Sequence, residues 1–241
     1  MTKKDLAKLV RSHLDELSGT WLKDTSSDPL GSFSIYDYLD LAYKQYAKET
    51  ECFKVNYTKA AVVGTDIYKN SDFGTSGAGG RIFNLIYVAF NSVTIYPVTE
   101  SRLDAYNSNW RFAANGTPTN WLKYSNKSFR LFPKPSAASD IYIEGYETPD
   151  ISSFTEDTEP DIEELDHSLL AVYASILVTV RDPSNTNAIR ASQLYPIWQA
   201  GIADARDRIH GPGSADVEVA REAGTQRAMP VAAQTITQAG G

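Results

Sequence analysis

Cysteine and histidine are scarce in this chain of 241 residues. Cys52 is the only cysteine, so neither an intramolecular disulfide nor a zinc site built from cysteines can form. We expect it to be a small buried apolar residue at the start of a strand. The three histidines, His13, His167 and His210, are predicted to lie on three separate helices. The sequence therefore lacks the pair of histidines at helical spacing that forms a ready metal site.

Long apolar runs are also missing. No stretch approaches the roughly 18 apolar residues that a membrane-spanning helix needs. The first residues, Met1 to Leu6, lack the apolar core of a secretion signal. We therefore expect a soluble protein that is made in a cytoplasm and has no membrane partner.

Catalytic and cofactor motifs are incomplete. The glycine-rich segment 74–80 lacks the Lys-Ser/Thr of a phosphate-binding loop, and no third glycine completes a dinucleotide fingerprint after Gly77 and Gly79. No Gly-x-Ser-x-Gly elbow supplies a nucleophile. Asp166 and His167 are adjacent, but neighbouring residues on a helix face different directions. We predict no catalytic residue, metal or cofactor, and interpret segment 74–80 as a hairpin tip.

Negative charge is concentrated in one segment. The net charge is −7, and residues 156–166 contain seven carboxylates and no base, so the rest of the chain is near neutral. A protein that grips DNA non-specifically needs a basic stripe, and none of that density is present. The acidic segment lacks the ligand spacing of a calcium loop. We interpret it as a charged linker before a helix.

Helical periodicity occurs at both ends of the sequence. A first helix is predicted over 2–17, and a second opens at Ser34, with Asp37 at the third helical position. After the acidic segment, one apolar face runs from Ile162 to Val180 and includes Leu165. A last helix is predicted over 187–210, with a kink or restart at Pro196, and residues 213–241 form an extended or disordered tail.

Between these helices, the period changes to two and β-branched and aromatic residues dominate. A short helix capped by Thr99 interrupts the strands. The sequence thus predicts an α+β protein with an inserted antiparallel β-sandwich or small barrel. Its parts are the N-terminal helices 1–50, the β region 51–150, the C-terminal helices 151–212 and the tail 213–241. The candidate strands are 52–57, 60–68, 82–90, 92–97, 119–125, 128–133 and 140–146.

Several short motifs follow one another in the β region and in the helix after the acidic linker. They are Pro97–Asp104, Trp110-Arg111, Gly116-Thr117-Pro118, Tyr124, Leu131–Pro135, Ile143–Tyr146, Asp166-His167 and Tyr173-Ala174. Their order resembles that of the head-to-tail adaptor, or connector, proteins of tailed bacteriophages, in which an acidic linker and a helix also follow the β region. The resemblance covers roughly residues 50–209, and segment 74–80 departs from the family pattern.

The resemblance implies a helical bundle that carries the β domain, and twelve copies that form a ring beneath the portal of a phage head. Such a ring joins the portal vertex to the tail and forms part of the DNA channel. The implied partners are the portal protein, tail or neck proteins, other copies of the chain, and double-stranded DNA that passes without specific binding. The implied location is the neck of the virion, after assembly in the bacterial host cytoplasm.

Two sets of residues are candidates for these contacts. Apolar residues are spaced as anchors in the polar tail, which we expect to order against the portal or a neighbouring copy. A loose tail with no role is the alternative. Glu163 and Glu164 are candidates for the acidic lining of the channel. The tail anchors are Val217, Val219, Met229, Pro230, Val231 and Ile236.

A second function from another class stays open. The 14 tyrosines and 4 tryptophans could supply stacking faces for a carbohydrate- or receptor-binding β module of a phage particle. The predicted helices on both sides of the β region favour the adaptor, because a simple glycan-binding module does not need them. An enzyme of an unrecognised type is the third alternative.

Overall fold

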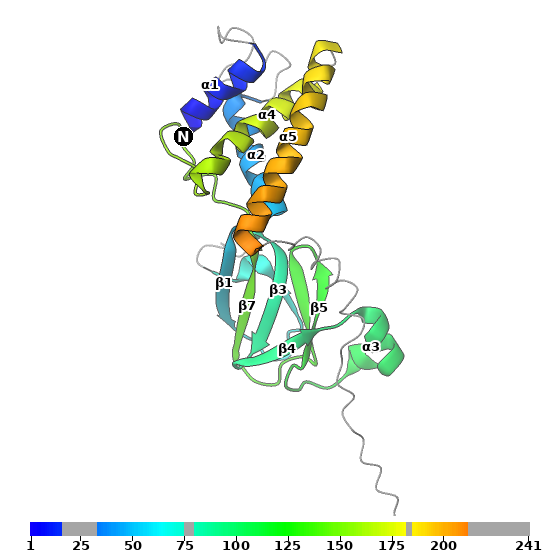
Figure 1. The fold of residues 1–241 in the computed structure, drawn as a ribbon. Helices are drawn as coiled ribbons and strands as arrows, with labels where there is room; N and C mark the ends of the chain where they lie inside the picture. Colours follow the sequence, from blue (N-terminus) through cyan, green and yellow to red (C-terminus); the bar gives the residue numbers. More distant parts are fainter. Residues whose placement is uncertain (16–32, 75–79, 182–184, 212–241) are drawn as a thin grey trace, which may run out of the picture.

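The computed structural model describes residues 1–15, 33–74, 80–181 and 185–211. Within these residues, helices from the two ends of the chain gather above one curled sheet (Figure 1). The predicted α+β class is confirmed. The tail 213–241, with its six candidate anchors, lies outside the described residues.

Side-chain caps start both N-terminal helices, and the one at Ser34 was predicted. α1 covers Lys3–His13, and its cap Thr2 accepts a hydrogen bond from the Asp5 amide. α2 covers Ile35–Thr50, and Ser34 and Asp37 form a reciprocal capping box. These caps satisfy amides that a helix start leaves without partners. α1 ends earlier than predicted, at His13.

The C-terminal helices differ from their predictions in two respects. α4 covers His167–Arg181, and Leu165 and Val180 are 77% and 71% exposed, so the predicted apolar face was wrong at these two positions. α1, α2 and α5 all pack against α4 (Figure 1), which buries it from several sides instead of along one stripe. α5 covers Asn185–His210 without a break at Pro196, so the predicted restart was wrong. Pro196 is exposed, and water can satisfy the carbonyl that it leaves unpaired.

One hydrophobic core joins these four helices. Trp198 of α5 is almost fully buried and lies 4.5 Å, centroid to centroid, from Tyr173 of α4 and 6.5 Å from Tyr46 of α2. Three helices therefore meet at one aromatic side chain. Other buried residues of this core include Leu6, Val10, Leu39, Ala42, Leu170, Ala174, Ile202 and Ala205.

The strands form one open sheet. It lacks the two packed sheets of the predicted sandwich, but its curl agrees in part with the predicted small barrel. The order is β1-β7-β3-β4-β5-β6-β2, and the sheet curls into a half-barrel (Figure 1). All neighbours are antiparallel except β4 and β5, which are parallel. The strands are β1 Lys54–Ala60, β2 Ile67–Lys69, β3 Ile82–Phe90, β4 Val93–Pro97, β5 Asn120–Ser125, β6 Ser128–Phe132 and β7 Asp140–Glu147.

The predicted strand positions hold for β3 to β7 within a residue or two. The first two predicted strands were divided wrongly, because β1 runs through to Ala60 and β2 is only three residues long. Gly145 explains one family motif: a Cβ there would lie 2.5 Å from the Asn84 carbonyl oxygen, beside an irregularity in the β3–β7 pairing. The sheet buries its own core on one face, separate from the helical core.

The parallel pair β4–β5 is joined by a small lobe. α3 covers Glu100–Tyr106 and starts at the predicted cap Thr99. A short 3₁₀ turn, Trp110–Phe112, follows it. Leu103, Trp110 and Leu122 form a third, small core that fixes the lobe to β5.

Candidate functional site: the linker and helix ends beside the sheet

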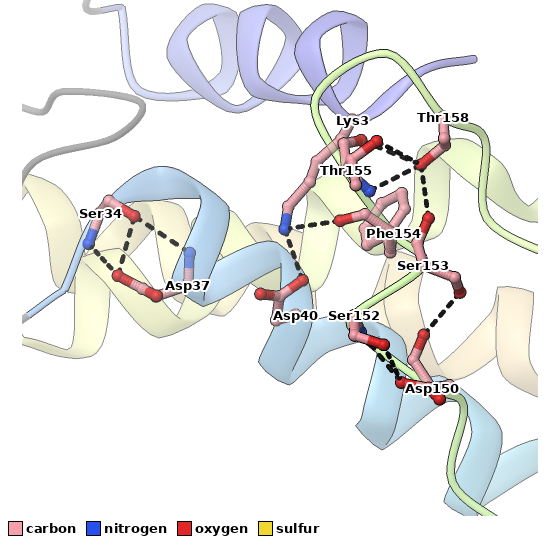
Figure 2. A network of polar contacts seen from close by, with 10 residues as sticks. All are labelled: Lys3, Ser34, Asp37, Asp40, Asp150, Ser152, Ser153, Phe154, Thr155 and Thr158. Carbon is pink, nitrogen blue, oxygen red and sulfur yellow. Dashed lines mark hydrogen bonds and ion pairs between the residues drawn. The ribbon is translucent and has the colours of Figure 1, made fainter.

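A buried lysine attaches the linker that follows β7 to two helices. Lys3 opens α1, and only 7% of its side chain is exposed. Its Nζ donates to Asp40 Oδ1 at 2.6 Å and to the Phe154 carbonyl oxygen at 3.1 Å (Figure 2). The same Nζ lies 4.8 Å from the Phe154 ring centroid and 5.3 Å from that of Tyr36. One cation thus joins α1, α2 and the linker.

The acidic linker also supplies partners for the start of α1. The Lys3 amide donates to the Thr158 carbonyl at 3.0 Å, and the Lys4 amide donates to the Glu156 carbonyl at 3.1 Å. Lys4 Nζ lies 3.6 Å from a Glu156 carboxylate oxygen. Carbonyls and carboxylates at a helix N-terminus are favourable because that end carries a partial positive charge. The linker is therefore part of the helical packing.

Side-chain turns hold the linker in shape between β7 and this contact. Asp150 Oδ1 accepts from the Ser152 amide at 3.0 Å and from its hydroxyl at 2.6 Å. The Thr158 hydroxyl accepts from the Thr155 amide at 2.7 Å and donates to the Ser153 carbonyl at 2.9 Å (Figure 2). These local bonds replace helix or strand pairing in this segment.

The acidic segment ends in an ion cluster with α5. Asp166 is buried, and its Oδ2 accepts from the Tyr46 hydroxyl at 2.6 Å. Arg208 donates to Asp166 Oδ1 at 2.5 Å and to Glu163 Oε2 at 3.1 Å. The hydrogen bond to Asp166 raises the pKa of Arg208, and burial together with Asp166 raises the pKa of Tyr46. Two of the seven carboxylates of the acidic segment, Glu163 and Asp166, are thus paired with Arg208 within the chain.

The two candidate channel residues, Glu163 and Glu164, therefore differ in whether their charge is paired within the chain. Glu163 is exposed but is engaged by Arg208. The Glu164 side chain is exposed and has no hydrogen bond or ion pair to any of the described residues. Of the two, Glu164 keeps its charge available to a ligand outside the chain.

α5 ends against the sheet. His210 Nε2 lies 2.7 Å from the Thr50 carbonyl oxygen, and the His210 ring contacts the Tyr146 ring of β7 edge to face at 6.1 Å. Nearby, Asn84 Nδ2 donates to Glu51 Oε1 at 2.7 Å. The C-terminal tail therefore begins where the helices meet the sheet.

The histidines and the cysteine show no arrangement for catalysis or metal binding within the described residues. The three histidines lie on α1, α4 and α5, as predicted, and His167 is buried at the start of α4. Cys52 is half-buried just before β1, and burial raises the pKa of its thiol to about 11, which keeps it protonated. The described residues contain no group of three acidic, histidine or cysteine side chains arranged to hold a metal. None of the described helices combines the length and apolarity that crossing a membrane requires.

Sequence reasoning missed Lys3, although a signal was present. Lys3 shares the spacing of Leu6, Ala7 and Val10, which form the buried stripe of α1. A lysine on an apolar stripe needs a counter-ion, and Asp40 supplies it from the neighbouring helix. Tyr106 and Phe112 on the α3 lobe were also missed, and they are 90% and 88% exposed.

The architecture is that of an α+β protein in which a helical core and a curled sheet are joined through the linker that Lys3 binds. The comparison with known families is specific: the family model described as SU10 adaptor protein matches residues 1–227. The chain therefore belongs to the SU10 adaptor protein family, a family of phage head-tail adaptors. No curated protein matches the chain. The match extends beyond residues 50–209, over both N-terminal helices and the first part of the tail.

Membership in this family makes the chain a component of a phage particle that works with other head or tail proteins. It is consistent with a structural role.

Proposed function

We propose that this protein is a non-enzymatic ring adaptor that joins the portal vertex of a phage head to the tail. The observation that carries the proposal is the family match, which spans the helices and the sheet together. About twelve copies associate head to tail, and a heterologous interface of this kind closes into a ring. The helices form a bundle in the ring wall, the sheet faces the tail, a neck protein or a neighbouring copy, and DNA passes through the centre.

The decisive experiment is electron microscopy of the purified protein mixed with its portal. The expected result is a ring that matches the portal's symmetry, stacked on it. The chain alone can remain monomeric, since the portal can act as the template. Particles in which the portal stays bare at saturating protein concentration would contradict the adaptor function.

The tail has a place in the same proposal. Residues 213–241 dock on the portal or a neighbouring copy, with Val217 and Val219 as proximal anchors and the other four apolar residues further on. A chain that ends at Gly213 keeps every described helix and strand. It should fold normally and lose portal binding, measured by co-sedimentation. Unchanged portal affinity would remove the tail from the interface. The distal anchors are Met229, Pro230, Val231 and Ile236.

Channel lining is proposed for the acidic segment, and Glu164 is the residue that can test it. Glu164→Lys reverses a charge with no partner among the described residues, whereas Glu163→Lys also breaks the pair with Arg208. DNA that passes an acidic wall is repelled and does not stick. We expect Glu164→Lys particles to eject DNA more slowly. An ejection rate equal to that of the unchanged particle would place Glu164 outside the channel.

The carbohydrate- or receptor-binding alternative loses the support of the tryptophans but keeps exposed tyrosines such as Tyr106. Trp110, Trp121 and Trp198 are at least 94% buried, so the tryptophans in the described part of the chain offer no open stacking face. Trp21 lies outside the described residues.

A further inference from the structure

The sheet has an open edge at β1. Among the described strands, β7 is the only neighbour of β1. The Glu147 amide donates to the Phe53 carbonyl at 3.0 Å, and the Ala61 amide donates to the Ser139 carbonyl at 2.8 Å. Hydrogen bonding alternates along an antiparallel pair, so odd-numbered residues bond to β7 and even-numbered ones point away. The backbone N–H and C=O groups at the open edge belong to Lys54, Asn56, Thr58 and Ala60. These groups have no backbone partners elsewhere in the described part of the chain.

The core of the sheet is also incompletely covered at this edge. Val55 and Tyr57 point toward that core but are only partly buried, unlike Ile141 and Ile143 on the neighbouring strand, which are fully buried. A further strand beside β1 would cover both side chains and supply partners for the open backbone groups. A sheet edge with unpaired backbone groups and partly covered core residues is a template for the addition of a strand.

The tail begins within reach of this edge. The His210 ring contacts Tyr146, and Tyr146 is paired with Lys54 at the start of β1. Gly211 has a φ of +88° and closes α5, so the chain turns there. A new strand would lie two strand spacings from β7, about 10 Å away. The three residues 212–214 span about 10 Å when extended.

The sequence that follows has the pattern of an edge strand. Residues 215–220 read Ala-Asp-Val-Glu-Val-Ala, so apolar and acidic side chains alternate. A period of two places Val217 and Val219 on one face and Asp216 and Glu218 on the other. The first face suits the uncovered core beside Val55 and Tyr57, and the second suits the polar outer face of β1.

We propose that residues 215–220 of this chain add to its own sheet as a strand parallel to β1, with Val217 beside Tyr57. The direction follows from α5, which delivers the tail to the Lys54 end of β1. In this arrangement, Val217 and Val219 contact the chain's own sheet in place of the portal or neighbouring copy proposed for them above. Only the distal anchors, Met229 to Ile236, then remain for contacts with the portal or a neighbouring copy. The added strand does not depend on the proposed ring, because every contact lies within one chain.

A disulfide tests the placement. In a Cys52→Ser background, Thr58→Cys and Glu218→Cys put two thiols on the outer face of the proposed pair, within the Cα separation that a disulfide spans. Mild oxidation should yield a disulfide within one chain, seen as faster migration on a non-reducing gel at monomer mass. The control pairs Thr58→Cys with Gln238→Cys on the distal tail. Equal rates for the two pairs would overturn the proposal, and a disulfide formed only between two chains would show that another copy covers the edge.

Hydrogen exchange supplies an independent measurement on the isolated protein. In the full chain, the amides of Asn56 and Thr58 should exchange about tenfold or more slowly than in a chain ending at Gly213, because only the full chain covers them. The amides of Val55 and Tyr57 bond to β7 and should change little. Identical exchange at Asn56 and Thr58 in the two proteins would refute the added strand. Because no portal is present, that failure would leave the adaptor function standing.

Discussion

Lys3 offers the sharpest test of how the helices hold the linker. Replacement by methionine keeps most of the unbranched stem and removes the charge. The variant Lys3→Met leaves the Asp40 carboxylate without the donor at 2.6 Å and the Phe154 carbonyl without the donor at 3.1 Å. It also removes the cation beside the Phe154 and Tyr36 rings. All losses fall at one junction between α1, α2 and the linker.

The expected loss in the free energy of unfolding depends on how exposed the Lys3 and Asp40 side chains are. Removing one member of a fully buried ion pair costs about 3 to 5 kcal/mol, because the other charge is left uncompensated. The Asp40 side chain is 20% exposed, against 7% for Lys3, so water relieves part of that cost. We expect Lys3→Met to lower the free energy of unfolding by about 2 to 3 kcal/mol at pH 7. The double variant Lys3→Met with Asp40→Leu should regain most of this loss, because no charge remains buried.

The effect should depend on pH with a definite sign. Burial raises the pKa of Asp40 above its ordinary value of 3.8, and Lys3 opposes this shift. Without Lys3, the pKa rises further. A carboxyl group with a raised folded-state pKa binds a proton more readily in the folded protein, so stability falls as pH rises through that pKa. The deficit of Lys3→Met should therefore be smaller at pH 4 than at pH 7.

Urea denaturation followed by far-ultraviolet circular dichroism at both pH values measures these differences. Lys8→Met is the matched control on the same helix, because Lys8 is 66% exposed and pairs with Asp5 at the surface. Its loss should stay below about 0.5 kcal/mol. A Lys3→Met deficit no larger than that of the control, or one that does not change between pH 4 and pH 7, would refute the account of Lys3 as a buried counter-ion.

Three further substitutions test other parts of the fold. Gly145→Ala places a Cβ 2.5 Å from the Asn84 carbonyl oxygen and should lower the free energy of unfolding by about 2 kcal/mol. Urea denaturation measures this loss. An unchanged urea midpoint would show that β3 and β7 can separate at Gly145. Tyr46→Phe removes a donor from buried Asp166 and should cost about 1 to 2 kcal/mol by the same assay. Ser34→Ala removes the cap of α2 and should cost about 1 kcal/mol, with Ser34→Asn restoring most of it in thermal melts.

Features that depend on neighbouring residues could be predicted from the sequence. The caps at Ser34 and Thr99 lie where the spacing placed them, because a cap is a contact between residues three apart. The strand β3 has the predicted bounds, 82–90, because alternation and β-branched residues mark it locally. The seven carboxylates of the linker were recognised, but their partners were not.

Features that depend on distant residues could not be predicted in the same way. Leu165 and Val180 fit an apolar period, yet both are exposed, because the 3₁₀ turn before α4 and the packing around it decide burial. The parallel pairing of β4 with β5 depends on the α3 lobe between them. Asp166 was considered only beside His167, whereas its partners lie 120 residues earlier and 42 residues later in the chain.

The contacts of the linker between β7 and α4 explain how one chain can keep the helical core and the sheet core in a fixed arrangement. The chain passes from helices to sheet after α2 and returns through the linker to α4. The first crossing is held by the Asn84–Glu51 bond, and the second by the contacts of Lys3 with Asp40 and Phe154. Neither contact lies inside the core of the sheet. Loss of Lys3 should therefore loosen the second crossing and the helical core while the sheet keeps its own packing, because its buried residues belong to a different cluster.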